Sequence, residues 1–299
     1  MKRLEGKVIV VTGSGRGFGR GMAYAYAEEG ARVVVVARTM GELKTLQESI
    51  ESNGGECLIA PADLSKVDDL YGLRDVVESE FGRLDVLVNN AATSPWKLFE
   101  ETTIDDWDKT VSVNLRAPFI LSKLFLPMMK KQAKGSIINV TSASAQMGFV
   151  AEICYCPSKY GLEGLTQCLA MELYQYNIAV NSLNVAAPEG KRLKPTELTL
   201  SEARKMPDEI RKMYADDDSM AKAFSNAWTF MALQDAHGVT GQRLGTKQLE
   251  DFLRANGWDA AVATWKAKLT KAVYVTYDLP DRVRYQTPEG GTKELYFKK

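Results

Sequence analysis

The chain has 299 residues, of which 45% are hydrophobic and 25% charged; these values are typical of a folded, enzyme-sized domain and exclude a disordered chain. Its 38 basic residues balance its 38 acidic residues, so no excess charge would attract a nucleic acid or an anionic membrane. A single histidine, and four cysteines without a C-x-x-C pair, predict no metal site and no disulfide framework and argue against histidine-dependent nucleophilic catalysis.

The sequence contains no apolar signal segment and no apolar stretch of transmembrane length. We therefore expect no membrane association and a cytoplasmic location. The predicted partner is a small molecule.

Strand-like apolar runs alternate with helical segments from the start of the chain. The runs are rich in valine and isoleucine, which is typical of parallel strands buried on both faces. The predicted strands are residues 8–11, 32–37, 57–60, 84–88, 136–140 and 178–183, and the predicted helices include 18–29, 40–51, 67–81 and 104–129. Because crossovers between parallel strands are right-handed, this order predicts a doubly wound α/β sheet of the Rossmann type.

The pattern loosens after residue 183. Residues 184–199 carry prolines, a glycine and charges, and residues 200–231 resemble helices, so we predict a substrate lid near 185–232. A last strand is expected within 239–246, which would end a single catalytic domain spanning 1–246.

Residues 247–299 form a predicted C-terminal extension. It begins with two helical stretches, and alternating apolar residues before a glycine pair then predict a hairpin. Trp258 and Trp265 are expected either to cover a neighbouring subunit or to cap the chain's own active site.

The first predicted strand leads into a glycine-rich loop and then into a helix. Glycines allow positive φ and bring backbone N–H groups close to a pyrophosphate, while the helix N-terminus adds partial positive charge. This context favours dinucleotide binding over a plain surface turn. The residues expected to bind the cofactor in this loop are Gly13, Ser14, Arg16, Gly17, Phe18 and Gly19.

The second predicted strand ends at Arg38, where folds that bind NAD place an acidic residue for the ribose hydroxyls. A guanidinium is suited to a 2′-phosphate through paired hydrogen bonds. Arg16 could close on the same phosphate. The two cations, without a competing carboxylate at the strand end, favour NADP over NAD.

Tyr155 is followed four residues later by Lys159, a spacing that puts both side chains on one face of a helix. A tyrosine exchanges protons poorly near neutral pH unless a cation stabilises its phenolate. Ser142 ends the strand-like run before it and could hold a substrate oxygen against the tyrosine. The Tyr–Lys pair alone fits a structural role equally well, but its coincidence with the loop and the serine favours catalysis.

With these motifs the sequence resembles the short-chain dehydrogenase/reductase family over roughly residues 5–246. The motifs are Thr12-Gly13-x-x-x-Gly17-x-Gly19, Asp63, Asn89-Asn90-Ala91-Ala92, Asn114, Ser142 and Tyr155-x-x-x-Lys159. The resemblance implies that Asn114 anchors a water-mediated proton relay and that Ser142 orients the carbonyl. It implies that Tyr155 exchanges the proton and that Lys159 binds the nicotinamide ribose and lowers the tyrosine's pKa. It further implies a homodimer or homotetramer and additional cofactor contacts from Asp63, Leu64, Asn90, Ala91, Tyr155 and Lys159.

The chain departs from the family pattern near the expected nicotinamide end. Val185-Ala186 replaces the usual Pro-Gly, Gly190 replaces a threonine, and the glycine pair that usually follows the last strand is missing. These differences concern the contacts around the nicotinamide and the entry loop. The roughly fifty residues after Thr246 extend past the family's common end, so the assembly is expected to depart from the usual tetramer.

The sequence thus predicts an NADP(H)-dependent oxidoreductase that transfers a hydride between the nicotinamide and a ketone or secondary alcohol. The alternative is a catalytically silent NADP(H)-binding sensor on the same fold. We expect a medium-sized, partly hydrophobic substrate, because the candidate lining residues are mostly apolar. They are Ser94, Pro95, Trp96, Gln146, Met147, Phe149 and Cys154.

Overall fold

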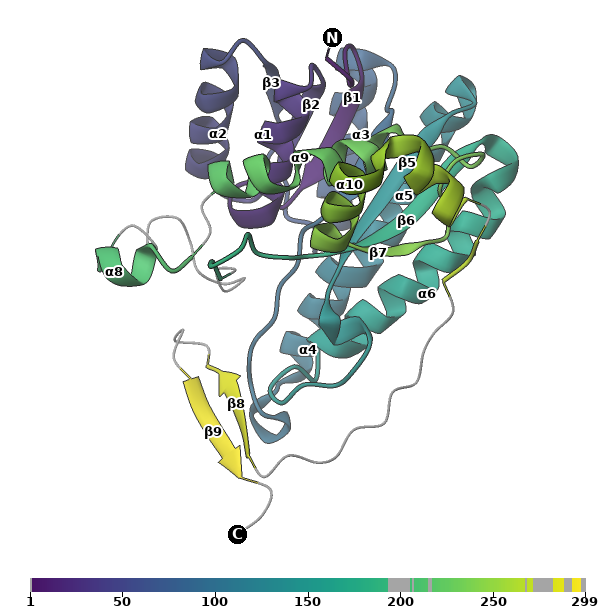
Figure 1. Ribbon diagram of the computed structural model, residues 1–299. Coiled ribbons are helices and arrows are strands. Elements are labelled where there is room, and N and C mark those ends of the chain that lie inside the picture. Colours follow the sequence, from purple (N-terminus) through teal and green to yellow (C-terminus); the bar gives the residue numbers. More distant parts are fainter. Residues whose placement is uncertain are drawn as a thin grey trace.

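The computed structural model describes residues 2–192, 205, 207–214, 217–266, 268–270, 282–287 and 292–296. Within these ranges, seven parallel strands form one sheet in the order β3-β2-β1-β4-β5-β6-β7 (Figure 1). The strands are β1 (Val8–Thr12), β2 (Arg32–Val36), β3 (Glu56–Ile59), β4 (Val86–Asn89), β5 (Gly135–Thr141), β6 (Ile178–Asn184) and β7 (Arg243–Gly245). The prediction of a doubly wound Rossmann-type sheet is confirmed.

Helices cover both faces of the sheet. The helices are α1 (Gly17–Glu28), α2 (Met40–Ser52), α3 (Val67–Phe81), α4 (Ile104–Val111), α5 (Ala117–Gln132), α6 (Tyr155–Leu173), α8 (Asp208–Arg211), α9 (Asp217–Leu233) and α10 (Thr246–Trp265). Alternate residues of β1 face opposite layers: Ile9 and Val11 pack with α1, α2, α9 and α10, while Val8 and Val10 pack with α3, α5 and α6. Both faces are therefore buried, which explains the uniformly apolar strands.

The predicted helix 104–129 is interrupted by a π-helical turn, η2 (Ser112–Arg116), between α4 and α5. A π turn inserts an extra residue into the helix and commonly marks a functional position. Asn114 lies in this turn and is fully buried. Short 3-10 turns also occur at η1 (Phe99–Glu101), η3 (Ala143–Ala145) and η4 (Tyr174–Tyr176).

Much of the predicted lid belongs to the core. Phe224, Trp228 and Phe230 of α9 are buried, and the ring of Phe18 on α1 meets that of Trp228 edge to face at 5.1 Å. The sequence could not separate α9 from a lid, because an amphipathic helix fits either role. Residues 193–204, in the middle of the predicted lid, lie outside the described part of the chain.

The helical part of the predicted extension packs on the catalytic domain. Leu249, Leu253 and Ala261 of α10 belong to the same buried cluster as α1, and Gly257 (φ 79°) joins two helical stretches across a kink. The expected hairpin is present as β8 (Arg282–Gln286) paired antiparallel with β9 (Thr292–Tyr296); its predicted turn, 288–291, lies outside the described residues.

Trp258 and Trp265 do not cap the active site as one interpretation predicts. Trp258 packs against Phe230 at 5.4 Å and lies under the guanidinium of Arg3 at 4.9 Å. Trp265 packs against Phe252 at 4.9 Å. The Trp258 ring therefore attaches α10 to α9, whereas the Trp265 ring packs within α10 across its kink at Gly257.

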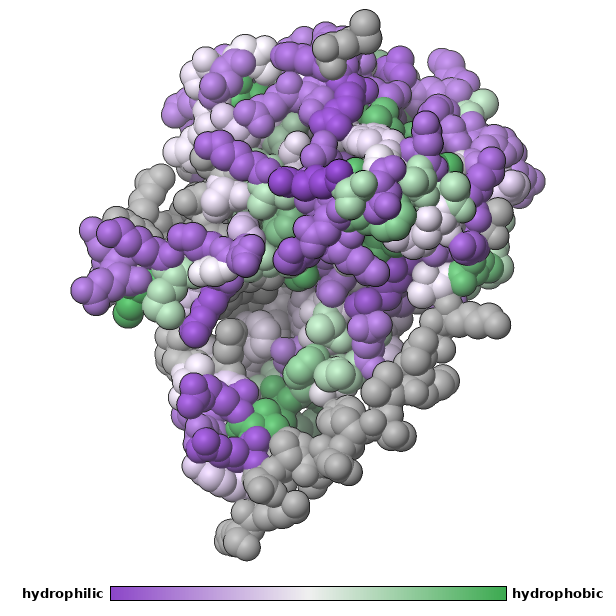
Figure 2. Space-filling model, in the orientation of Figure 1, coloured by the Kyte–Doolittle hydropathy of each residue, from purple (hydrophilic) through white to green (hydrophobic). Residues whose placement is uncertain are grey.

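The surface seen in Figure 2 is mostly hydrophilic, with separate small hydrophobic areas. Among the helices that the structure describes, none combines the length and apolar character needed to cross a bilayer.

Candidate active site

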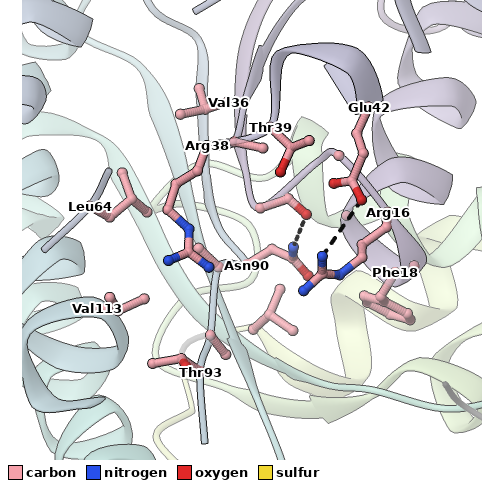
Figure 3. Close-up of a pocket in the computed structure, with 18 of the residues that line it drawn as sticks. Arg16, Phe18, Val36, Arg38, Thr39, Glu42, Leu64, Asn90, Thr93 and Val113 are labelled. Carbon is pink, nitrogen blue, oxygen red and sulfur yellow. Dashed lines mark hydrogen bonds and ion pairs between the residues drawn. The ribbon is translucent and has the colours of Figure 1, made fainter. Parts of the chain in front are cut away.

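A cavity of about 250 Å³ opens at the carboxyl ends of the central strands, the edge where parallel α/β sheets bind their ligands. It brings together nearly all of the predicted cofactor-binding residues, from the segments that follow β1, β2, β3 and β4 and from helix α6; Figure 3 shows part of this lining. The predicted residues that line it are Gly13, Arg16, Gly17, Phe18, Gly19, Arg38, Asp63, Leu64, Asn90, Ala91, Tyr155 and Lys159.

The glycine-rich loop is held against the end of β4. The Asn90 side-chain amide donates to the carbonyl oxygens of Thr12 (2.8 Å) and Gly13 (3.2 Å), and the Thr12 hydroxyl accepts from the Asn90 backbone N–H at 3.0 Å. Gly13 has φ 66°, and a Cβ there would lie 2.7 Å from the Cα of Ala91. Only glycine fits this close approach without strain.

Ser14 is the one predicted cofactor-binding residue of the loop that does not line the cavity. Its backbone N–H donates to the carbonyl oxygen of Val36 at 3.1 Å, and its hydroxyl accepts from the Val36 N–H at 2.8 Å. The residue is fully buried. Its polar groups therefore tie the loop to β2, a contact between residues far apart in sequence.

Arg38 and Arg16 both line the cavity, and Figure 3 places their guanidinium groups on its two sides. Arg16 forms an ion pair with Glu42 at 3.6 Å, a carboxylate in α2 that the sequence pattern did not single out. Arg38 takes part in no ion pair with any residue that the structure describes. The end of β2 therefore offers a cation.

The Asp63 carboxyl lies beside this cation. Burial raises its pKa, but hydrogen bonds from Ser65 at 2.8 and 3.0 Å and the charge of Arg38 outweigh that effect and lower the pKa below its ordinary value. Asp63 is therefore ionised near neutral pH and can accept hydrogen bonds.

Two of the four predicted catalytic residues, Tyr155 and Lys159, line the cavity. Tyr155 begins α6, and the Lys159 ammonium lies 5.5 Å from the centre of its ring. Lys159 is 2% exposed and donates to the Val140 carbonyl oxygen at 2.8 Å. Ser142 follows β5 directly, and its hydroxyl is hydrogen-bonded to Tyr155. The structure therefore brings three of the four predicted groups together.

The fourth predicted catalytic residue, Asn114, is fully buried in the π-helical turn η2. Its side-chain amide donates to the Thr93 carbonyl oxygen (2.9 Å) and the Ser158 hydroxyl (3.0 Å), and its oxygen accepts from the Thr93 N–H at 2.8 Å. Asn114 thus links the loop after β4 to α6.

The pKa of Tyr155 moves opposite to the prediction. Burial raises it above the ordinary value for tyrosine, the nearby Glu152 raises it further, and the hydrogen bond with Ser142 only partly opposes them. Burial also lowers the pKa of Lys159 to about 8, with Glu163 opposing. In the protein alone Tyr155 is therefore a neutral phenol, because the cost of burying a phenolate exceeds the stabilisation that the sequence pattern assumes.

The sequence patterns did not single out several polar residues that lie around Ser142. Arg243 of β7 donates to the Ser142 carbonyl oxygen at 2.8 Å and pairs with Glu163 of α6 at 2.9 Å. The Ser142 hydroxyl donates to the Ser144 hydroxyl at 3.2 Å, which donates to Glu152 at 2.6 Å. Ser144 lies two residues after Ser142 and Glu152 lies three residues before Tyr155, and this closeness in sequence is the only signal that pointed to them. Arg243 is far from both along the chain, so no local pattern indicates its role.

The candidate substrate-lining residues differ in their placement. Trp96 stacks on Tyr155 with ring centres 6.1 Å apart and has a positive φ of 52°. Phe149 is 42% exposed, and Cys154 is fully buried, which removes Cys154 from the set. Ser94 and Pro95 line a second cavity, which shares Thr93 and Lys109 with the first and is lined by more polar groups than expected.

A glycine-rich strand–loop–helix turn and a tyrosine–lysine pair at one edge of a parallel sheet define a dinucleotide-dependent oxidoreductase of the Rossmann class. The chain belongs to the short-chain dehydrogenase/reductase family, because the family model described as short chain dehydrogenase matches residues 7–195. The resemblance drawn from the motifs is confirmed.

Sequence similarity to known proteins covers most of the chain. An uncharacterized oxidoreductase of Thermotoga maritima is 38% identical over 242 residues, which is 79% of this chain and 94% of that protein. A 3-oxoacyl-(acyl-carrier-protein) reductase of the same organism is 32% identical over 246 residues, 81% of this chain and 97% of that protein. The crystal structure of a metagenomic short-chain oxidoreductase in complex with NADP superposes with a TM-score of 0.66 at 28% identity, covering 81% of this chain and 98% of that one.

Proposed function

We propose that this chain is an NADP(H)-dependent oxidoreductase that interconverts a ketone and a secondary alcohol, with Tyr155 as general acid/base. The observation that carries the proposal is that the buried Tyr155 lines the same cavity as Arg16 and Arg38. Bound NADPH would supply the hydride, and the chain would supply binding, orientation and the proton.

Each residue of the site has a distinct part in this reaction. Tyr155 in its neutral form donates its proton to the substrate oxygen as negative charge develops there. Ser142 orients that oxygen, and Lys159, fixed by Val140, holds the ribose next to the tyrosine. Asn114 contributes to the path that returns a proton to Tyr155.

The preference for NADP over NAD rests on Arg38. A guanidinium at the end of β2 matches a 2′-phosphate, whereas NAD is usually recognised there by a carboxylate. Structural neighbours that contain NADP, such as the metagenomic oxidoreductase, support this assignment. The other cofactor contacts are proposed for the cavity-lining residues named above.

An activity screen of the purified full-length protein tests the function. NADPH consumption should be seen with at least one member of a broad panel of ketones and aldehydes, and NADP reduction with the corresponding alcohol. Tight NADPH binding without turnover on the whole panel would favour the silent sensor and contradict the proposed enzyme.

We also propose that the protein is a homo-oligomer. Phe119 on α5 and Met171 and Tyr160 on α6 are 49%, 57% and 46% exposed, and contact with a second subunit would remove these large side chains from water. We expect sedimentation velocity at micromolar concentration to give a dimer or tetramer. A monomer under these conditions would contradict the proposal.

The proposed location is the cytoplasm. All four cysteines are free thiols, as is usual in a reducing compartment. Cell fractionation that found the protein outside the cytoplasm would contradict this.

A further inference from the structure

A chain of hydrogen bonds runs from the catalytic serine to a carboxyl group that the proposed reaction does not use. The Ser142 hydroxyl donates to the Ser144 hydroxyl at 3.2 Å, and the Ser144 hydroxyl donates to Oε2 of Glu152 at 2.6 Å. Ser144 is only 4% exposed, so few alternative partners compete. Glu152 is half-buried and keeps contact with solvent, through which it can exchange a proton.

The protonation state of Glu152 fixes the direction of this chain. An ionised carboxylate can only accept hydrogen bonds. Ser144 then points its proton at Glu152 and leaves its oxygen as an acceptor for Ser142. The Ser142 oxygen also accepts from the backbone N–H of Ser144 at 3.2 Å, so its own proton is directed to Ser144 in this arrangement and not to the substrate. A protonated carboxyl can donate instead, so that Ser144 donates to Ser142 and the Ser142 proton becomes available to the substrate oxygen.

We propose that Glu152, acting through Ser144, determines whether Ser142 can donate a hydrogen bond to the carbonyl oxygen, and that Glu152 is therefore a positioning residue for carbonyl reduction. This inference rests on the proposed function and adds a residue pair to it. A donor aimed at the oxygen matters most in the transition state, where the negative charge is largest.

The surroundings of Glu152 move its titration above the ordinary range of a glutamate. Burial raises the pKa of Glu152 above its ordinary value, and the hydrogen bonds from Ser144 and Cys156 oppose the shift only in part. Tyr155 and Cys156 face it from α6. Lys97, whose backbone pairs with that of Glu152, directs its ammonium to Asp106 at 2.8 Å. Among the residues that the structure describes, no ion pair is formed with the Glu152 carboxylate.

The sign of the pH effect follows from the donor form. Because the protonated carboxyl aims Ser142 at the substrate, carbonyl reduction is fastest below the pKa of Glu152 and slows as the pH rises through that value. The fall lies above the ordinary titration range of glutamate. Removal of one such donor lowers rates by on the order of 100-fold, so we expect a step of tenfold or more.

The test is the pH profile of kcat/KM for NADPH-dependent carbonyl reduction in the full-length protein. Profiles are measured for the unaltered enzyme, Glu152→Gln, Ser144→Ala and the double variant. We expect the step to disappear in both single variants, and Glu152→Gln to have no further effect once Ser144 is alanine. NADPH affinity should stay within about twofold throughout, since neither side chain lines the cofactor cavity.

Two further variants separate this role from a merely structural one. Cys156→Ala removes the other donor to the same Glu152 oxygen, at 3.5 Å, and should keep the step. Ser144→Thr keeps the hydroxyl and should also keep it. A step that persists in Glu152→Gln, or effects of the two single variants that multiply in the double variant, would overturn the proposal, whereas absence of turnover in the unaltered protein would overturn the proposed function itself.

Discussion

Tyr155→Phe is expected to lower kcat for carbonyl reduction by about 10²- to 10⁴-fold, the range that a general acid contributes, while NADPH affinity stays within a few fold. The substitution removes the hydroxyl and keeps the ring, so the stacking on Trp96 and the packing at the start of α6 remain. The measurements are steady-state kinetics for kcat and a fluorescence titration for NADPH affinity.

Tyr160→Phe is the matched control, because Tyr160 lies in the same helix with its ring 46% exposed. It should leave both quantities unchanged. If Tyr155→Phe kept full activity, the proton would have to come from another group. If it abolished NADPH binding as well as turnover, the hydroxyl would act in cofactor binding and the assignment of Tyr155 as the acid would lose its support.

The sheet was predictable because its strands are short and buried on both faces. In β1, Val8–Thr12, every residue is buried, so the apolar run is visible without knowing which side faces which helix. The glycine-rich loop and the Tyr155–Lys159 pair were equally predictable, since each pattern depends on local spacing, along one loop and along one helix.

The features of the site that the sequence did not predict depend on contacts between segments far apart in the chain. Arg243 reaches the Ser142 carbonyl across 101 residues of chain, and Ser14 reaches Val36 across 22. The burial that raises the pKa of Tyr155 arises from elements packed around it, including Trp96. No local pattern encodes these effects, so the sequence predicted which residues gather at this edge of the sheet but neither the burial of Ser14 nor the effect of burial on the pKa of Tyr155.

The sequence did not separate the predicted substrate lid from the core, for a related reason. Helix α9 carries an apolar stripe that could cover a substrate or a sheet. It packs with α1 on the sheet face, and only Met220 at its start lines the cofactor cavity. The helical pattern alone contains no information on which apolar surface the stripe meets.

Arg38→Asp should reverse the cofactor preference. The variant loses the cation proposed to bind the 2′-phosphate and gains a carboxylate that repels it. Charge-assisted hydrogen bonds contribute about 1.5–3 kcal/mol each, so we expect kcat/KM with NADPH to fall by about 100-fold. The new carboxylate can accept from the ribose hydroxyls of NADH, so kcat/KM with NADH should be unchanged or higher.

Arg16→Gln is the control variant for Arg38→Asp. Arg16 lines the same cavity, but Glu42 already balances part of its charge at 3.6 Å, so its loss should weaken NADPH use less than the loss of Arg38 does. Arg38 forms no ion pair with the described residues, but its charge favours the ionised form of Asp63, so Arg38→Asp should lower the melting temperature by about 4 °C or less. Equal losses with NADPH and NADH in Arg38→Asp would mean that the guanidinium supports the adenosine region in general, and NADP selectivity would then have to come from elsewhere in the cavity.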